Sequence, residues 1–225
     1  RLVRKGWVLR DRIAFLRLTG VDLVHLNNSP YGGYFDWLPA ARWCRLPCLT
    51  HARGFPWRST DPIAHFLSHR FDRVITISRC IDDAYRKDDV PERQLRQIYD
   101  GVDVEEVRAA VRRSPTEVRS SLGLQPDQIV VVMVGHLRAW KGQDVVISAL
   151  AELLARGRRQ FHLLLVGGPT NSEDDRYIEQ LKTMVHRAGL EPSVTFLGPR
   201  RDAVDFMNAA DIVVHASTSP EPFGL

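Results

Sequence analysis

The feature that most constrains the fold is a regular alternation of apolar runs with helix-like segments in the second half of the chain. Four apolar runs (129–134, 161–166, 194–197 and 211–215) alternate with three segments of helical spacing (143–155, 172–188 and 203–209). The first two runs are continuously apolar, which is typical of strands buried on both faces of a sheet. Parallel strands need crossover helices, and these cover both faces. The pattern predicts a doubly wound α/β unit in which Ser172 caps the second helix.

The first half of the chain repeats this pattern less regularly. Strand candidates lie at 22–26, 48–51, 73–77 and 95–99. They predict a second α/β unit that lacks its beginning. The segment between the units is charged and carries Pro115 and Pro126, so it is interpreted as a connection. The expected organisation is an incomplete domain at 1–103, a connection at 104–127 and an incomplete domain at 128–225.

Composition restricts the class of protein. Hydrophobic residues make up 44% of the chain, yet no run reaches the length of a membrane-spanning helix and no signal peptide is visible at the start. The three cysteines form no CxxC pair, which argues against a disulfide framework or a zinc knuckle. A cytoplasmic protein is expected. No RNA- or DNA-binding module is visible, so no nucleic-acid partner is expected.

Positive charge is concentrated in the first 20 residues. Six cations there face a single acidic residue: Arg1, Arg4, Lys5, Arg10, Arg12 and Arg17 against Asp11. The excess suits an anionic partner such as a phosphorylated ligand or a membrane face, and it equally suits a solvated helix face.

Glycine-bearing loops follow all four strands of the second half. They read GHLRAWKG (135–142), GGP (167–169), GPRR (198–201) and STSPEPFG (217–224). Ligands of open α/β sheets bind outside the carboxyl ends of the strands, and helix N-termini with nearby cations suit phosphate. One such loop alone would be interpreted as ordinary surface, but four on one edge favour a diphosphate site. Neither a G-x-G-x-x-G fingerprint nor a P-loop is present.

These motifs resemble a known family. The segments GHLRAWKG (135–142), VTFLG (194–198), ADIVVHAS (210–217) and SPEPFGL (219–225) look like the donor-binding half of glycosyltransferase family 4. In the first half, RVITIS (73–78) and IYDGVD (98–103) are similar to that family's segments. The resemblance implies a GT-B architecture, that is, two Rossmann-like doubly wound α/β domains, both incomplete in this chain.

The family resemblance also implies an activity. The protein would move a hexose-type sugar from a nucleotide-sugar donor to a glycan or lipid-linked acceptor, with retention at the anomeric carbon. A role in cell-envelope polysaccharide or glycolipid synthesis follows, as does a cytoplasmic location with peripheral contact to the anionic inner membrane face. Neither a metal nor a cofactor is expected, since the nucleotide-sugar is itself a substrate.

Carried over residue by residue, the resemblance gives a donor site in the second half. Lys141 would hold the diphosphate, and Glu221 would accept hydrogen bonds from donor-sugar hydroxyls. The family's usual arginine is replaced here by His136, and Arg138 lies two positions later, so the second cation is open between them. The expected donor-binding residues are Gly135, His136, Arg138, Lys141, Gly167, Gly198, Glu221, Phe223, Gly224 and Leu225.

In the first half, the resemblance places His51 close to the donor sugar and its leaving phosphate. By itself, a histidine after a strand is equally well a core or loop residue. With Lys141 and Glu221 it completes the expected catalytic set. The expected acceptor-side residues are Gly32, Gly33, Asp100 and Gly101, and a flexible connection would explain the two glycines of the 30–34 loop equally well. 

The spacing of two histidines bears on whether a metal is bound. His65 and His69 stand four apart on a predicted helix but have no third ligand nearby, so no metal site is expected.

The expected mechanism is a same-face displacement in which the departing phosphate takes the acceptor proton. Lys141 and Arg138 would stabilise the charge that grows on that phosphate. Two alternatives stay open. One is a sugar phosphorylase or epimerase with the same fold, and the other is a non-catalytic module that binds nucleotide-sugars or glycans.

Overall fold

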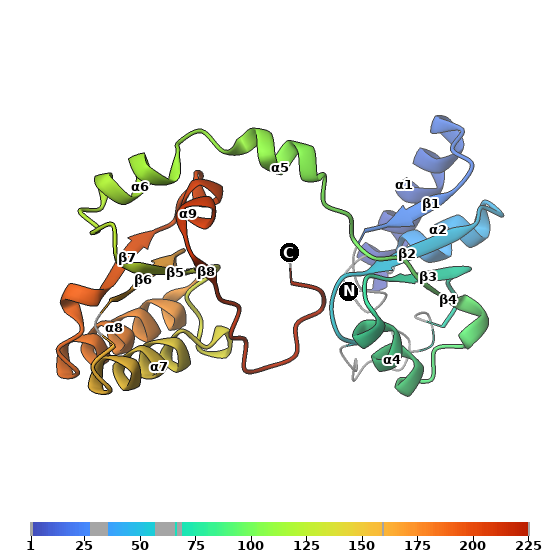
Figure 1. Ribbon diagram of the computed structural model, residues 1–225. Coiled ribbons are helices and arrows are strands. Elements are labelled where there is room, and N and C mark those ends of the chain that lie inside the picture. Colours follow the sequence, from blue (N-terminus) through green and yellow to red (C-terminus); the bar gives the residue numbers. More distant parts are fainter. Residues whose placement is uncertain (1, 28–35, 57–65, 67–68, 159, 225) are drawn as a thin grey trace. The chain divides into compact units, whose positions relative to one another are not determined.

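The computed structural model describes the chain apart from residues 1, 28–35, 57–65, 67–68, 159 and 225, and apart from the side chains of 2–7. Contacts divide the chain into two compact units (Figure 1). The first contains Arg1–Gly101 together with Glu221–Leu225, and the second contains Val102–Pro220. Both are α/β with parallel sheets, as predicted.

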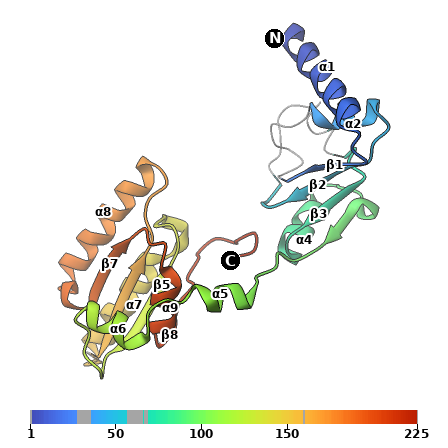
Figure 2. The same cartoon turned by 90° about the horizontal axis from the view of Figure 1, so that it is seen from above.

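The first unit is built on a parallel sheet of four strands in the order β1-β2-β3-β4. These are β1 (Val24–Leu26), β2 (Cys48–Ala52), β3 (Arg73–Thr76) and β4 (Leu95–Gln97). Its described helices are α1 (Leu2–Thr19), α2 (Trp37–Trp43), α4 (Arg79–Lys87) and the 3-10 turn η1 (Glu92–Gln94). Helix α2 packs against α1 and β1, and α4 packs against β3 and β4 (Figure 2). Buried apolar side chains from these elements form one core.

The second unit also has a four-stranded parallel sheet, in the order β7-β6-β5-β8. Its strands are β5 (Ile129–Val134), β6 (Phe161–Val166), β7 (Val194–Gly198) and β8 (Ile212–Val213). Its helices are α5 (Val104–Ala110), α6 (Pro115–Ser121), α7 (Gln143–Ala155), α8 (Ser172–Arg187) and α9 (Ala203–Ala209), with 3-10 turns η2 (Ala139–Lys141) and η3 (Glu191–Ser193). The predicted strands at 129–134 and 161–166 and the helices at 143–155 and 203–209 are confirmed at both ends.

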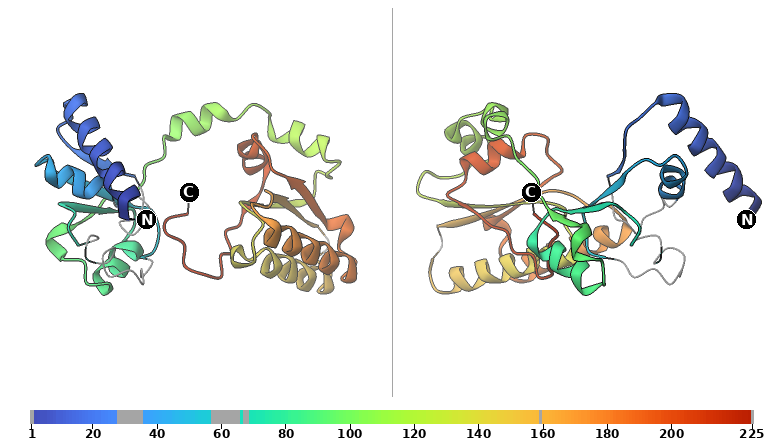
Figure 3. Two further views of the ribbon diagram at one scale, coloured as in Figure 1. Left: turned by 180° about the vertical axis from the view of Figure 1, so that it is seen from behind. Right: turned by 90° about the vertical axis from the view of Figure 1, so that its right-hand side faces the viewer.

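Alternation along the strands of the second unit produces two cores. On β6, Leu163 and Leu165 pack with α7 and α8, whereas Leu164 and Val166 pack on the opposite face with α6 and α9. Figures 1 and 3 show the two helix pairs on opposite faces of the sheet. Successive strand side chains point to opposite faces, so a run of buried apolar residues requires cover on both sides. The doubly wound prediction is confirmed.

The predicted cap of α8 is displaced by one residue. The N-cap is Asn171, whose side chain accepts hydrogen bonds from the backbone N–H groups of Glu173 and Asp174, and Ser172 is the first helical residue. Both residue types cap helices well, and here the asparagine has the extended backbone that an N-cap requires.

The segment 104–127, predicted as a connection, groups with the second unit and contains α5 and α6. Buried Asp205 of α9 explains this grouping. Its carboxylate accepts hydrogen bonds from the backbone N–H of Arg112 at 2.8 Å and from the Nε of Arg113 at 3.1 Å. These hydrogen bonds lower the pKa of Asp205, the largest contribution coming from the Arg112 N–H. The segment is therefore fastened to the second unit through α9.

Across the described residues, no helix combines the length and the apolar composition required to cross a membrane.

Candidate functional site

The strand order of the second sheet reverses between β5 and β8. Counted along the unit, the strand order is third, second, first, fourth, so the first and fourth strands are neighbours. In sheets of this order the ligand binds beyond the carboxyl ends of those two strands. The segments that leave this point are the β5–α7 loop, residues 135–142, and the chain that follows β8, residues 214–220.

These two segments are in contact through their backbones. The N–H of Thr218 donates to the carbonyl of Trp140 at 2.9 Å. Gly142, the N-cap of α7, has a φ of +79°, and a Cβ placed on it would lie 2.1 Å from the carbonyl oxygen of Ala216. Only glycine satisfies both the left-handed backbone and this close approach. The N-terminus of α7 is thereby held beside the chain that leaves β8.

The three predicted strand-end glycines lie next to one another at the sheet edge. The N–H of Gly135 donates to Val166, the last residue of β6, and the N–H of Gly167 donates to Gly198, each at 2.9 Å. A Cβ on Gly167 would lie 1.8 Å from the carbonyl oxygen of Gly135. At Gly167 the glycine thus allows neighbouring loops to approach each other, whereas Gly135 and Gly198 have open space where a side chain would stand.

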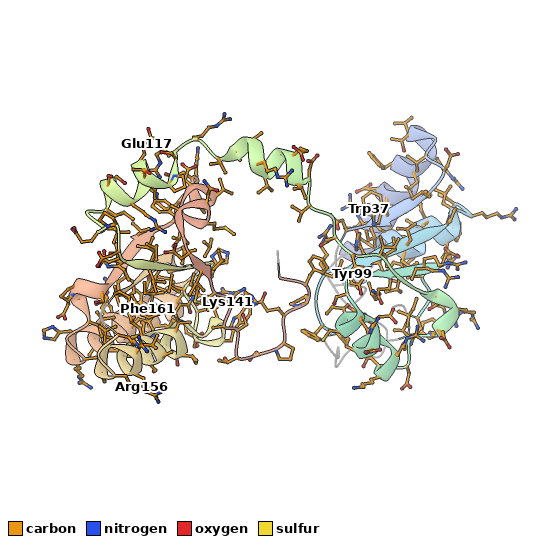
Figure 4. All side chains as sticks on the ribbon, in the orientation of Figure 1. Trp37, Tyr99, Glu117, Lys141, Arg156 and Phe161 are labelled. Atoms are coloured by element: carbon orange, nitrogen blue, oxygen red, sulfur yellow. The ribbon has the colours of Figure 1, made fainter. Side chains whose placement is uncertain are left out.

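Lys141 is the last residue of the η2 turn that leads into α7. Its side chain, labelled in Figure 4, is half-buried, and its Nζ lies 4.5 Å from the centroid of the Trp140 ring. This distance corresponds to a cation–π contact. The structure thus places a full positive charge at the entrance to a helix N-terminus, where the backbone dipoles also favour an anion.

Arg138, the other predicted cation, is held by residues of the neighbouring loop. Its Nε lies 3.0 Å from Oδ2 of Asp174 in the first turn of α8, and another guanidinium nitrogen donates to the Thr170 hydroxyl. The same carboxylate oxygen accepts from the N–H and the hydroxyl of Thr170. The hydroxyl of Thr170 and then Arg138 lower the pKa of Asp174 to about 2. The charge of Arg138 is therefore already paired within the protein.

His136 follows Gly135 directly and its side chain is exposed. Its backbone carbonyl accepts a hydrogen bond from Nε2 of Gln143 at 3.0 Å. Gln143 is only 1% exposed, and its Oε1 has no hydrogen-bond partner among the described residues. The position of the loop after Gly135 thus depends on a buried amide at the start of α7.

The last described residues group with the first unit. The carbonyl of Pro222 accepts a hydrogen bond from the Ser78 hydroxyl, and the rings of Phe223 and Tyr99 lie 6.0 Å apart. Glu221 is half-buried and Gly224 is exposed. Leu225 lies outside the described residues. The predicted donor-binding set is therefore divided, with Glu221, Phe223 and Gly224 in one unit and the rest of its described members in the other.

In the first unit, polar side chains surround His51 near the end of β2. Its Nε2 lies 3.9 Å from Oδ1 of Asp100, and Oδ2 of Asp100 accepts from Nη1 of Arg53 at 2.9 Å. The His25 ring stacks against the His51 ring at 5.8 Å. Burial lowers the pKa of His51, and Arg53 lowers it further. Of the acceptor-side residues, Gly101 is exposed next to Asp100, whereas Gly32 and Gly33 lie outside the described residues.

Several residues of the site were not predicted from the sequence: Thr170, Asp174, Gln143, His25 and Arg53. Asp174 was interpretable only as one acidic residue in a helix first turn, which stabilises the helix dipole wherever it occurs. Its pairing with Arg138 spans 36 residues, and no local pattern indicates such a contact.

In the described part of the chain, no group of three or more histidine, cysteine or acidic side chains is arranged to hold a metal ion. His65, one of the two histidines weighed as a metal pair, lies outside the described residues.

Comparisons with known proteins cover both halves. The model of glycosyltransferase family 4 matches residues 1–106, and the model of group 1 glycosyl transferases matches residues 115–225. A D-inositol 3-phosphate glycosyltransferase of Rhodococcus erythropolis is 36% identical over 98% of this chain and 46% of its own length. That of Nocardia farcinica is 32% identical over 91% of this chain and 48% of its own. The chain spans about half the length of these curated relatives.

Solved structures agree. The Anabaena protein HepE in complex with UDP is 27% identical, with a TM-score of 0.82 over 96% of this chain and 58% of its own. Its complex with UDP-glucose is 30% identical, with a TM-score of 0.75 over 94% of this chain and 58% of its own. A glycosyltransferase of Rickettsia africae, at 19% identity and a TM-score of 0.82, shares the fold. Because both halves match in chain order and both sheets have the expected GT-B organisation, the chain belongs to the group 1 glycosyltransferases of family 4.

Proposed function

We propose that the protein transfers a sugar from a nucleotide-sugar donor with retention of anomeric configuration. The observation that carries this proposal is the arrangement at the β5/β8 edge. Lys141 lies there directly before Gly142, the N-cap of α7, and the close approach at Gly142 places that helix against the chain that leaves β8. A lysine and first-turn amides together suit a diphosphate, whose negative charge increases as the sugar departs.

For the donor, we propose a UDP-linked hexose. HepE, which resembles this chain at 27–30% identity, is solved in complex with UDP and with UDP-glucose. Each charge-assisted hydrogen bond to the diphosphate contributes about 1.5–3 kcal/mol, so a lysine and two amides together contribute roughly 4.5–9 kcal/mol, which corresponds to a Kd between about 0.5 mM and the micromolar range.

For the mechanism, we propose a same-face displacement. The departing phosphate takes the proton of the acceptor hydroxyl while Lys141 stabilises its charge, His51 lies near the sugar and leaving phosphate, and Glu221 binds donor hydroxyls. No protein nucleophile, metal or cofactor takes part, so activity should survive a chelator. A glycosyl adduct trapped on a side chain would contradict this mechanism.

For the acceptor, we propose a glycan or lipid-linked hydroxyl of the cell envelope. The names of the curated relatives favour a second candidate, an inositol phosphate. An acceptor panel containing both classes distinguishes them.

The test is a transfer assay with UDP-, GDP- and ADP-glucose, with the product's anomeric configuration read by proton NMR. Retention with one preferred nucleotide is expected, and Lys141→Gln should abolish most turnover. Two outcomes would overturn the proposal. Phosphate-dependent turnover without nucleotide indicates a phosphorylase, and donor binding without transfer, unchanged by Glu221→Ala, indicates a binding module.

We further propose that the protein acts in the cytoplasm and contacts an anionic membrane through α1. On this helix Phe15 is 52% and Leu18 is 89% exposed, beside the exposed cations Arg10 and Arg17. Apolar and basic side chains together favour an anionic interface. Sedimentation with phosphatidylglycerol vesicles should fall on reversing both charges to Glu and persist after the control Arg158→Glu. Equal losses would refute the contact.

A further inference from the structure

Five polar side chains gather at the carboxyl edge of the first sheet. His25 and Asn27 come from the end of β1, His51 and Arg53 from the end of β2, and Asp100 from the segment after β4. Three of them carry or can carry positive charge, and Asp100 is the only carboxylate among the five. How that one charge is shared determines the electrostatic environment of His51.

Asp100 is largely buried, its side chain being 14% exposed, and it contacts two partners unequally. Its Oδ2 accepts a hydrogen bond from Nη1 of Arg53 at 2.9 Å, while its Oδ1 lies 3.9 Å from Nε2 of His51. The second distance is too long for a hydrogen bond. Nε2 of His51 is accordingly buried with no hydrogen-bond partner among the described residues.

A second contact fixes Arg53 in this position. Its Nε donates to Oδ1 of Asn27 at 2.7 Å, so the planar guanidinium is held from two sides. One carboxylate oxygen of Asp100 is therefore engaged by Arg53, and the other faces His51. On the other face of His51, the His25 ring lies 5.8 Å away with the planes 20° apart, which adds a second imidazole rather than an anion.

We propose that Asp100 and Arg53 are positioning residues that act on His51 in opposite directions: Asp100 faces the imidazole ring and attracts it, while Arg53, held by Asn27, occupies the other carboxylate oxygen and opposes that attraction. The inference rests on the proposed function, in which His51 is next to the transferred sugar. It gives the Asp100 side chain a role of its own at the carboxyl edge of the first sheet.

Electrostatics support this assignment. Burial lowers the pKa of His51, Arg53 and His25 lower it as well, and Asp100 raises it. The neighbouring strand β3 presents Ile75 opposite His51, so the charged and titratable groups that face it in the described structure are Arg53, Asp100 and His25.

The first test is an NMR titration of the intact protein labelled at histidine Cε1, with the His51 resonance assigned through His51→Gln. Asp100→Asn removes an attraction for the protonated ring, so its midpoint should move to lower pH. Arg53→Gln removes a repulsion, so its midpoint should move to higher pH. Arg73→Gln is the matched control, because it removes the same charge at the opposite end of the sheet.

The second test is kinetic. Both variants should reduce kcat on the order of tenfold and displace the pH profile in the directions seen by NMR, with little change in donor KM, because the ring is misaligned rather than the donor lost. Shifts in the same direction, or shifts no larger than that of Arg73→Gln, would overturn the inference. If one variant does not fold, the sign of the other's shift still decides. Failure of Lys141→Gln to weaken donor binding would instead refute the proposed function and leave the titration unaffected.

Discussion

The contact between Gly142 and the chain leaving β8 can be tested with a pair of glycines that share a backbone conformation. Gly142 has a φ of +79° and Gly157, at the end of α7, has a φ of +78°. A Cβ on Gly142 would lie 2.1 Å from the Ala216 carbonyl oxygen, whereas a Cβ on Gly157 would meet nothing within 4 Å. Substituting alanine at each position therefore separates backbone strain from the contact.

The expected magnitudes follow from these two environments. A left-handed alanine costs about 1 kcal/mol at either position. At Gly142 the new methyl group must also displace backbone, and forced overpacking costs roughly 1–3 kcal/mol more. We expect Gly157→Ala to lower the free energy of unfolding by about 1 kcal/mol and Gly142→Ala to lower it by about 2–4 kcal/mol.

Amide hydrogen exchange of β5 and β6 measures this free energy for the second unit alone. Calorimetric titration with UDP-glucose should also show weaker binding for Gly142→Ala and unchanged binding for Gly157→Ala, because only the former moves the two binding segments apart. Equal destabilisation by both variants would mean that the close approach to Ala216 does not exist and that Gly142 does not hold the two segments of the proposed donor site together.

Three further predictions concern the second unit. Lys141→Gln should raise the Kd for UDP-glucose about 10- to 100-fold in calorimetry, since one charged hydrogen bond is lost. Arg138→Gln should change this Kd little, because the guanidinium of Arg138 already binds Asp174. Equal losses of affinity in the two variants would contradict this prediction. Phe206→Ala should lower the unfolding free energy by about 3–5 kcal/mol in urea denaturation, because the ring is 2% exposed, and a loss below about 1 kcal/mol would contradict the packing. Burial lowers the pKa of His162, so below about pH 6.5 the unfolded chain binds a proton that the native state does not. The free energy of unfolding should therefore fall as the pH drops below 6.5, and His162→Gln should reduce this dependence on pH.

Strands were predictable from sequence where they are long and buried on both faces. The ends of the shorter strands were not predictable, because they depend on where the neighbouring strand in the sheet ends. The prediction of a strand at 95–99 extends past β4, which ends at Gln97, the residue paired with the last residue of β3, Thr76. Ile98 and Tyr99 beyond it are more than half exposed. Their β propensity indicated a strand. The N–H of Ile98 still donates to the carbonyl of Thr76 at 2.9 Å, but the register of paired residues ends at Gln97.

The candidate site shows the same limit. Loop positions and charge types could be predicted, because strand ends in a parallel sheet share one edge. Arg138 and Lys141 are equivalent in sequence terms, yet the structure places the guanidinium of Arg138 against Asp174 and Thr170 and the ammonium of Lys141 over the Trp140 ring. The pairing of Arg53 with Asp100 joins residues 47 apart, which requires the packed sheet and not a motif.

The position of the Lys141 ammonium over the Trp140 ring should make the intrinsic fluorescence of this tryptophan sensitive to movement of the ammonium. Trp140 is the only tryptophan in the sequence between residues 102 and 220, and the Nζ of Lys141 lies 4.5 Å from its ring centroid. A diphosphate bound as proposed would attract that ammonium away from the indole, whose emission responds to nearby charge. Under the proposed function, donor binding would therefore change the fluorescence of Trp140, one of the five tryptophans of the chain, without any added label.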